Sequence, residues 1–418
     1  MKPVLKTSSL SLAFALAALS GCQGGASTGH TDTQNSTFRH GLPPTLRDAD
    51  KLALTDTNVD YMLALRSAAL KLTGNYPTAA DIQKLQNSQN QAADYATIID
   101  GYLNSPAFAS MQVSFWRNTM KIGAGETVGT PAAMNDCAPT FAASLVAGPG
   151  VGGAGQDFRR VLTATTDGTG KAGTCPTLSN GVFTPGEAPA QTGIPVTGVL
   201  TDKAVMAQFM SSMAFRRGRW VQETFMCVRF PAETGTPPVS TPSAPAGYVN
   251  PWPWNSITGD DPVVSPAVAP INFLVRDGLI CANCHATLNH IAPLFGKFDT
   301  TGAYVMGSAF KVPTPIATPR DSIMSDWLPA GETTAWRWQK PVADLPALAQ
   351  AITADPGFGR CMATRVWNWA MSRGDVVNEG SVLTDALANP MAAAFVADNY
   401  NMKNMIRRVF NDPNYVRY

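Results

Sequence analysis

Apolar residues recur every three or four positions between residues 56 and 122. The clearest stripe is formed by Tyr95, Ile98, Ile99, Tyr102 and Leu103. This spacing is typical of one buried helix face. Thr78 and Asp81 lie at the spacing of a capping box, and Ser105-Pro106 is a typical helix start. We therefore expect an N-terminal helical region over residues 56–122.

The helical period stops at residue 123, where glycine clusters separate short apolar pieces. They include Gly148-Pro149-Gly150 and Gly168-Thr169-Gly170. Glycine clusters can cradle a phosphate, but that site requires a preceding strand, a following helix and a lysine at fixed spacing. The sequence shows none of these here, so residues 123–200 are expected to be a loop-rich insertion containing short strands.

Helical patterning returns at Thr201-Asp202 and continues, with interruptions, to the C-terminus. Residues 231–262 contain eight prolines and two tryptophans, which is typical of an extended segment that wraps over another surface. Further helices are expected from Asp344 and from Asn389-Pro390. The whole pattern predicts a mainly α protein whose C-terminal helical unit spans residues 201–418.

Composition narrows the function classes. The 418 residues have a net charge of +1, and only 15% of them are charged. A nucleic-acid partner would call for a strongly basic surface, so we expect none.

The N-terminus has the organisation of an export signal. Lys2 and Lys6 precede an apolar run of about ten residues, which is too short to span a bilayer stably. The run ends in Leu19-Ser20-Gly21-Cys22, which resembles a bacterial lipobox. The resemblance implies a signal peptide at 1–21, a lipid on Cys22 and a flexible tether over residues 22–55. Gln23 is not the aspartate that retains such proteins in the inner membrane, so an outer-membrane anchor is expected, facing the periplasm or the cell surface.

Candidate chemistry concentrates in Cys281-Ala282-Asn283-Cys284-His285. This is the C-x-x-C-H pattern of covalent haem c attachment, in which two thiols form thioethers and the histidine ligates the iron. A zinc site or a plain disulfide is the alternative. A zinc site would need a second cysteine pair or a pair of histidines, and only His290 follows nearby. We therefore predict one covalent haem held by Cys281, Cys284 and His285.

The remaining cysteines are even in number, as expected for an exported chain. They are Cys137, Cys175, Cys227 and Cys361, and they allow three pairings. Cys137 and Cys175 share one loop-rich region, which favours a Cys137–Cys175 bond and leaves Cys227 for Cys361. Free buried thiols are the alternative.

The sixth iron ligand is expected to be a methionine on a later loop. Met324 fits best because it lies between the haem segment and the next predicted helix. Met306, Met362, Met371 and His290 are alternatives, as is an open position. The basic stretch Arg216-Arg217-Gly218-Arg219 is either a solvated helix face or a contact for the haem propionates.

Several stretches resemble one family. They are Leu72–Thr78, Arg217–Cys227, Cys281–Gly302 and Phe358–Arg373. They are similar to exported, planctomycete-type cytochrome C domain proteins, most of them domains of unknown function. The resemblance implies a haem on Cys281 and Cys284, ligated by His285, in a segment that Phe298-Asp299 and Gly302 close. This chain has Asn289-His290-Ile291-Ala292 where the family usually has Asp-Pro-x-Gly.

These observations favour a membrane-anchored mono-haem cytochrome that passes single electrons to a redox partner protein in the envelope. No dinucleotide fingerprint, zinc-protease motif or catalytic-triad order accompanies the haem motif. Two alternatives stay open. One is a haem enzyme with an open sixth position, and the other is a non-catalytic surface lipoprotein.

Overall fold

A computed structural model of the chain describes residues 59–122, 137–165, 175–186, 191–228, 230, 285, 287–306, 311–312, 320–328, 331–337, 340–374 and 381–417. All of them belong to one unit, Pro44–Tyr418. The predicted signal peptide, Cys22, the tether and the proline-rich stretch at 231–262 lie outside the described residues. So do Cys281 and Cys284.

Four helices form the N-terminal region. They are α2 (Tyr61–Thr73), α3 (Ala79–Gln86), α4 (Gln91–Leu103) and α5 (Pro106–Met120). Each follows a residue whose side chain accepts a hydrogen bond from the first turn, namely Asp60, Thr78, Asn90 and Ser105. The capping box predicted for Thr78 and Asp81 is confirmed. Local capping chemistry thus sets where these helices begin.

The insertion is more helical than its glycine content predicts. It contains α6 (Cys137–Ala147) and α7 (Arg160–Thr163), followed by the two-stranded antiparallel sheet of β1 (Leu178–Ser179) and β2 (Val182–Phe183). Every residue of α6 is buried. A helix buried on all sides is apolar all round, so it carries no amphipathic stripe that a sequence pattern could show.

The C-terminal region continues the helical architecture. Its first elements are α8 (Lys203–Gln208), η2 (Ser212–Ala214), α9 (Phe215–Met226) and η3 (Ala292–Phe295). Short antiparallel pairs follow, β3 (Lys311–Val312) with β4 (Arg320–Asp321) and β5 (Ala335–Trp336) with β6 (Lys340–Pro341), and η4 (Met324–Asp326) lies between them. The last elements are α11 (Leu345–Thr353), α12 (Pro356–Ala370), α13 (Asp385–Ala397) and α14 (Met402–Phe410).

One boundary differs from the prediction. A helix was expected to start at Asn389-Pro390, but α13 begins at Asp385 and contains Pro390 in its interior. Pro390 is the sixth residue of α13, beyond the first turn in which proline is usual, and it leaves one backbone hydrogen bond of the helix unmade. The Asn389-Pro390 signal therefore predicted that a helix is present but not the residue at which it begins.

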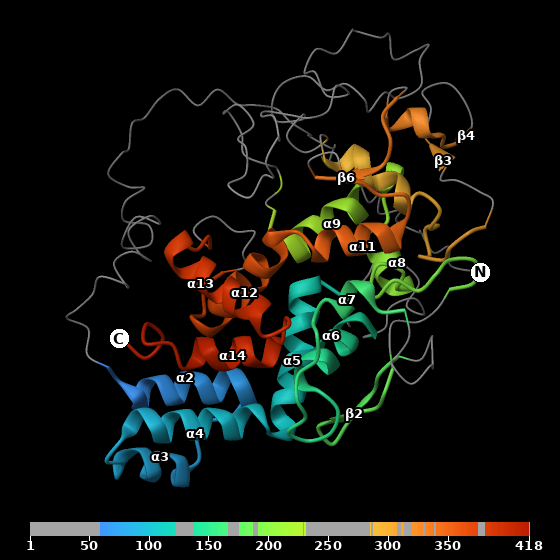
Figure 1. Cartoon of the computed structure of the whole chain (residues 1–418). Helices are drawn as coiled ribbons and strands as arrows, with labels where there is room; N and C mark the ends of the chain where they lie inside the picture. Colours follow the sequence, from blue (N-terminus) through green and yellow to red (C-terminus); the bar gives the residue numbers. More distant parts are fainter. Residues whose placement is uncertain are drawn as a thin grey trace, which may run out of the picture. The chain divides into compact units, whose positions relative to one another are not determined.

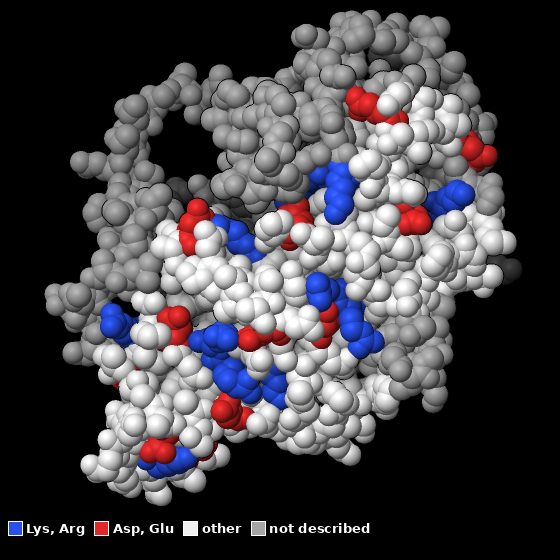
Figure 2. Space-filling model, viewed as in Figure 1, with Lys and Arg blue, Asp and Glu red and all other residues white. Residues whose placement is uncertain are grey.

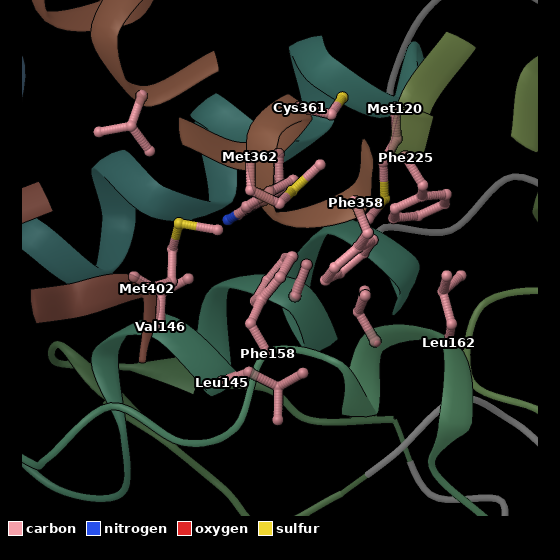
Figure 3. Close-up of a cluster of buried hydrophobic side chains, with 14 of the residues drawn as sticks. Met120, Leu145, Val146, Phe158, Leu162, Phe225, Phe358, Cys361, Met362 and Met402 are labelled. Atoms are coloured by element: carbon pink, nitrogen blue, oxygen red, sulfur yellow. The ribbon is translucent and has the colours of Figure 1, made fainter. Parts of the chain in front are cut away.

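One hydrophobic core joins helices from all three predicted regions. Helix α12 contacts α2, α9, α13 and α14, while α5 packs on α6 and α14 packs on α4. Figure 1 shows α14, drawn in red, beside the blue N-terminal helices. In the core, Phe158 from the insertion lies close to Met362 and Phe358 of α12 (Figure 3). The mainly α class predicted from the sequence is confirmed.

The described surface mixes the two signs of charge. Figure 2 shows basic and acidic side chains interspersed over the viewed face, and several form pairs such as Arg407 with Asp100 and Arg408 with Asp398. Within the described ranges, no helix combines the length and the apolar character needed to cross a membrane.

Candidate haem-attachment site

His285 lies in a helical segment formed by residues 285 and 287–291. Its half-buried ring has Nδ1 2.9 Å from Oδ1 of Asn289, which is fully buried four residues later. One helical turn separates the two residues, so they lie on the same face. The ring of Phe215 meets the imidazole edge-on, with centroids 4.9 Å apart. Two contacts thus orient the proposed proximal ligand.

Helix α9 packs closely against this segment because Gly218 has no side chain. A Cβ atom at Gly218 would lie 3.2 Å from Cγ1 of Ile291 and 3.5 Å from Cδ2 of Leu288. Both residues are buried, and both belong to the helical segment that contains His285. The glycine therefore permits close contact between α9 and the helical segment that contains His285.

Arg217, the neighbour of Gly218, is a fully buried arginine. Its guanidinium donates to the backbone carbonyls of Met206, Phe295, Phe298 and Asp299 at 2.7–3.2 Å. Burial lowers its pKa to about 9, and the charge of Asp299 opposes that effect. The group is therefore still charged at neutral pH. It connects residues 295–299 to α8 and α9. Arg217 is therefore not part of a solvated helix face, whereas Arg216 and Arg219 are exposed, and a contact with the haem propionates stays a prediction.

The segment closes in a tight turn after Phe298. Asp299 Oδ1 accepts from the backbone N–H groups of Thr301 and Ala303, at 2.8 and 3.0 Å. Gly302 has a φ of +76°, and a Cβ there would lie 2.0 Å from the carbonyl oxygen of Lys203. Only glycine fits this contact with α8. The Phe-Asp-x-x-Gly motif therefore has a structural reason in this chain.

Met324 lies on η4, a turn anchored beside the haem segment. Trp327, at the end of this turn, is buried, and its Nε1 donates to the carbonyl oxygen of Met213 at 3.0 Å. The Trp327 ring also lies close to Gly296, just after η3, since a Cβ atom at Gly296 would lie 3.4 Å from Cη2 of Trp327. Met324 itself is 50% exposed and Ile323 is 57% exposed. The thioether is therefore outside the core, on a turn held by buried contacts.

The other candidate ligands differ in their surroundings. His290 is buried, and its Nε2 lies 2.8 Å from Oε2 of Glu332. Met362 is a core residue (Figure 3). Met371 packs against the core while half-buried, and Met306 is exposed beside Gly193. Among these candidate ligands, Met324 and Met306 are thus exposed, whereas His290, Met362 and Met371 are buried or half-buried.

The four remaining cysteines form two disulfides. Cys137 bonds to Cys175 and Cys227 bonds to Cys361. This is the pairing that the sequence favoured. The second bond joins the end of α9 to α12, so it ties the chain together on both sides of the haem motif.

Of the three residues predicted to hold a c-type haem, the structure describes His285, and the surroundings of this residue are compatible with that role. His285 presents a ring whose Nδ1 is held by an amide oxygen, the arrangement that leaves Nε2 to face a metal. A haem also needs an apolar cover, and Phe215, which contacts the His285 ring, is an apolar group that retains exposed surface. Within the described ranges, no three His, Cys, Asp or Glu side chains gather into a metal-binding cluster.

Sequence reasoning missed the contacts that three residues make around this site. Asn289 could have been found from its i+4 spacing to His285, which places both on one helix face. Arg217 and Trp327 contact backbone carbonyls 11 to 114 positions away along the chain. No local pattern reveals partners at such separations.

Comparison of the chain with protein-family models, curated proteins and solved structures found no match. The likeness to planctomycete-type cytochrome C domain proteins therefore stays a prediction that depends on the motifs quoted above.

Proposed function

We propose that this chain is a mono-haem c-type cytochrome of the cell envelope that transfers single electrons to and from a partner protein. The proposal depends most on one observation. The histidine of the C-x-x-C-H motif, His285, has its Nδ1 in hydrogen-bond contact with the side-chain amide of the buried Asn289. In this proposal Cys281 and Cys284 hold the porphyrin through thioethers, and His285 ligates the iron.

The bound haem would supply one-electron chemistry, because its iron alternates between the ferrous and ferric states. The protein must keep the residues around the haem in the same positions in the ferrous and the ferric state. Arg217 and the turn at Asp299 fix the segment that follows His285. Gly218 allows α9 to pack closely against this segment. A rigid site of this kind limits reorganisation during electron transfer.

We infer that Met324 is the sixth ligand. The support is its exposed thioether on a turn that Trp327 fixes to η2 and η3. A methionine in this position would raise the reduction potential relative to a second histidine. His290 is less suitable because it is buried against Glu332.

We further propose that a lipid on Cys22 anchors the protein, at the outer membrane. The support is the ordered basic and apolar regions before a lipobox-like Leu19-Ser20-Gly21-Cys22. An anchor followed by a tether keeps the redox unit close to envelope partners without spanning the bilayer.

A pyridine haemochrome spectrum tests the proposal. The full chain is expressed with export and haem-maturation machinery, purified and compared with a Cys281→Ser/Cys284→Ser variant. We expect the c-type band in the wild type alone. Absence of the band from the wild-type protein would refute haem attachment.

A further inference from the structure

We propose that Asn289 is the positioning residue for the proximal ligand, and that its side-chain amide selects the tautomer of His285 and sets the reduction potential. This inference rests on the proposed function. Its basis in the structure is the contact between His285 Nδ1 and Asn289 Oδ1 at 2.9 Å.

The chemistry of the contact fixes the proton. An amide oxygen only accepts hydrogen bonds, so Nδ1 must carry the hydrogen. The neutral ring then has its lone pair on Nε2, the nitrogen that can ligate iron. If Nε2 carried the hydrogen instead, the ring could not bind the metal through that atom.

Burial makes the amide a rigid partner. Asn289 is 0% exposed, and its helix neighbours Leu288 and Ile291 are buried against Gly218 of α9. The edge-on Phe215 ring limits the rotation of the imidazole from another side. The acceptor and the ring therefore keep their relative orientation when the iron changes oxidation state.

The strength of this acceptor controls the donor strength of Nε2. A stronger acceptor at Nδ1 gives the ring more imidazolate character, which stabilises ferric iron and lowers the potential. Asn289→Asp strengthens the acceptor at nearly constant shape. Asn289→Leu removes the acceptor without changing the net charge, so an effect of this variant cannot arise from an added charge.

The experiment compares haem-loaded full-length proteins by spectroelectrochemical titration. We expect the midpoint potential to fall in Asn289→Asp and to rise in Asn289→Leu. Asn118→Asp and Asn118→Leu, at an exposed position of α5, are the matched controls and should leave the potential unchanged. Proton NMR of the ferric protein gives a second readout, since the exchangeable Nδ1–H resonance should be protected in the wild type and lost in Asn289→Leu.

The outcomes separate this inference from the proposed function. If the wild type contains no covalent haem, the proposed function fails. If all variants contain haem and the Asn289 variants match the Asn118 controls in potential, the role of Asn289 is refuted alone. Loss of haem attachment in both Asn289 variants, with attachment kept in the controls, would also overturn it, because the residue would then serve maturation and not ligand tuning.

Discussion

At the scale of single residues, buried polar groups organise the region around His285. Arg217 has no exposed surface, and its guanidinium donates hydrogen bonds to backbone carbonyls of two other segments. Buried carbonyl oxygens left without donors are costly, at roughly 1–3 kcal/mol each. The Arg217 guanidinium thus provides hydrogen-bond donors for four backbone carbonyls.

Arg217→Lys should destabilise the protein by roughly 3 kcal/mol. An ammonium group cannot reach all four carbonyls in the planar geometry of a guanidinium. Urea unfolding followed by circular dichroism measures the change. The control is Arg219→Lys on the same helix, where the exposed side chain pairs with Glu223 and the expected effect is below about 0.5 kcal/mol. Equal effects of the two substitutions would contradict the role assigned to Arg217.

Asp202 predicts a pH dependence of stability. It caps α8 from a fully buried position, and burial raises its pKa to about 6. Between pH 4 and 6 the folded state then binds more protons than the unfolded state, so this carboxyl group lowers the free energy of unfolding as the pH rises.

Asp202→Asn removes that titration while keeping an acceptor for the Val205 N–H. Relative to the wild type, the variant should gain on the order of 1–3 kcal/mol of stability between pH 4 and pH 7. Chemical unfolding at both pH values measures the gain. Asp344→Asn, at the exposed N-cap of α11, is the control and should gain less. A pH-independent difference between Asp202→Asn and the wild type would rule out a raised pKa.

At the scale of secondary-structure elements, the contact between α9 and the helical segment that contains His285 depends on Gly218. The nearest side-chain atom of Ile291 leaves space for a methyl group only after a shift of a few tenths of an ångström. A larger side chain must separate the two elements and displace His285 with its helix.

Gly218→Leu should therefore lower the yield of covalent haem and destabilise the fold by about 1–3 kcal/mol. The haem absorbance per mole of protein and the midpoint of urea unfolding measure these effects. Gly101→Leu is the control, because this helical glycine in α4 has open space where its Cβ would lie. A haem yield in Gly218→Leu equal to that of the control would show that the close approach has no bearing on the site.

The sequence predicted the elements whose signals are local. The capping box at Thr78 and the Ser105-Pro106 start identified α3 and α5, and the stripe over residues 95–103 identified α4, because each of these signals spans less than ten residues. Helix α6 was not predicted because it is apolar on every face. For α13, Pro390 suggested a start five residues after the observed first residue, Asp385. At the candidate site, the motif is the signal that predicts a role for His285. The support around it remained hidden because Arg217 finds its haem-segment partners about eighty positions away.

At the scale of the whole molecule, the three regions inferred from the sequence share one core. Helix α12 contacts α2 from the N-terminal region as well as α9, and Cys361 of α12 bonds to Cys227. The bond closes a loop of 134 positions that contains the haem motif, whereas the Cys137–Cys175 bond closes 38. Both crosslinks restrict the unfolded chain.

Replacing Cys227 and Cys361 by alanine should destabilise the protein by up to roughly 5 kcal/mol, and replacing Cys137 and Cys175 by up to roughly 4 kcal/mol. Thermal unfolding of both double variants measures the losses. Only the first pair brackets Cys281, Cys284 and His285, so we expect only its loss to reduce haem attachment. A larger haem deficit in the Cys137/Cys175 variant would contradict this assignment.

The central claim is that a porphyrin is covalently bound at Cys281 and Cys284. Intact mass spectrometry of the full chain, expressed with export and haem-maturation machinery, tests it most directly because one spectrum reports processing, acylation and haem together. We predict a chain that begins at Cys22 and carries a lipid and one haem. A mature chain without the mass of haem, with Cys281 and Cys284 joined to each other or bound to zinc, would contradict the account.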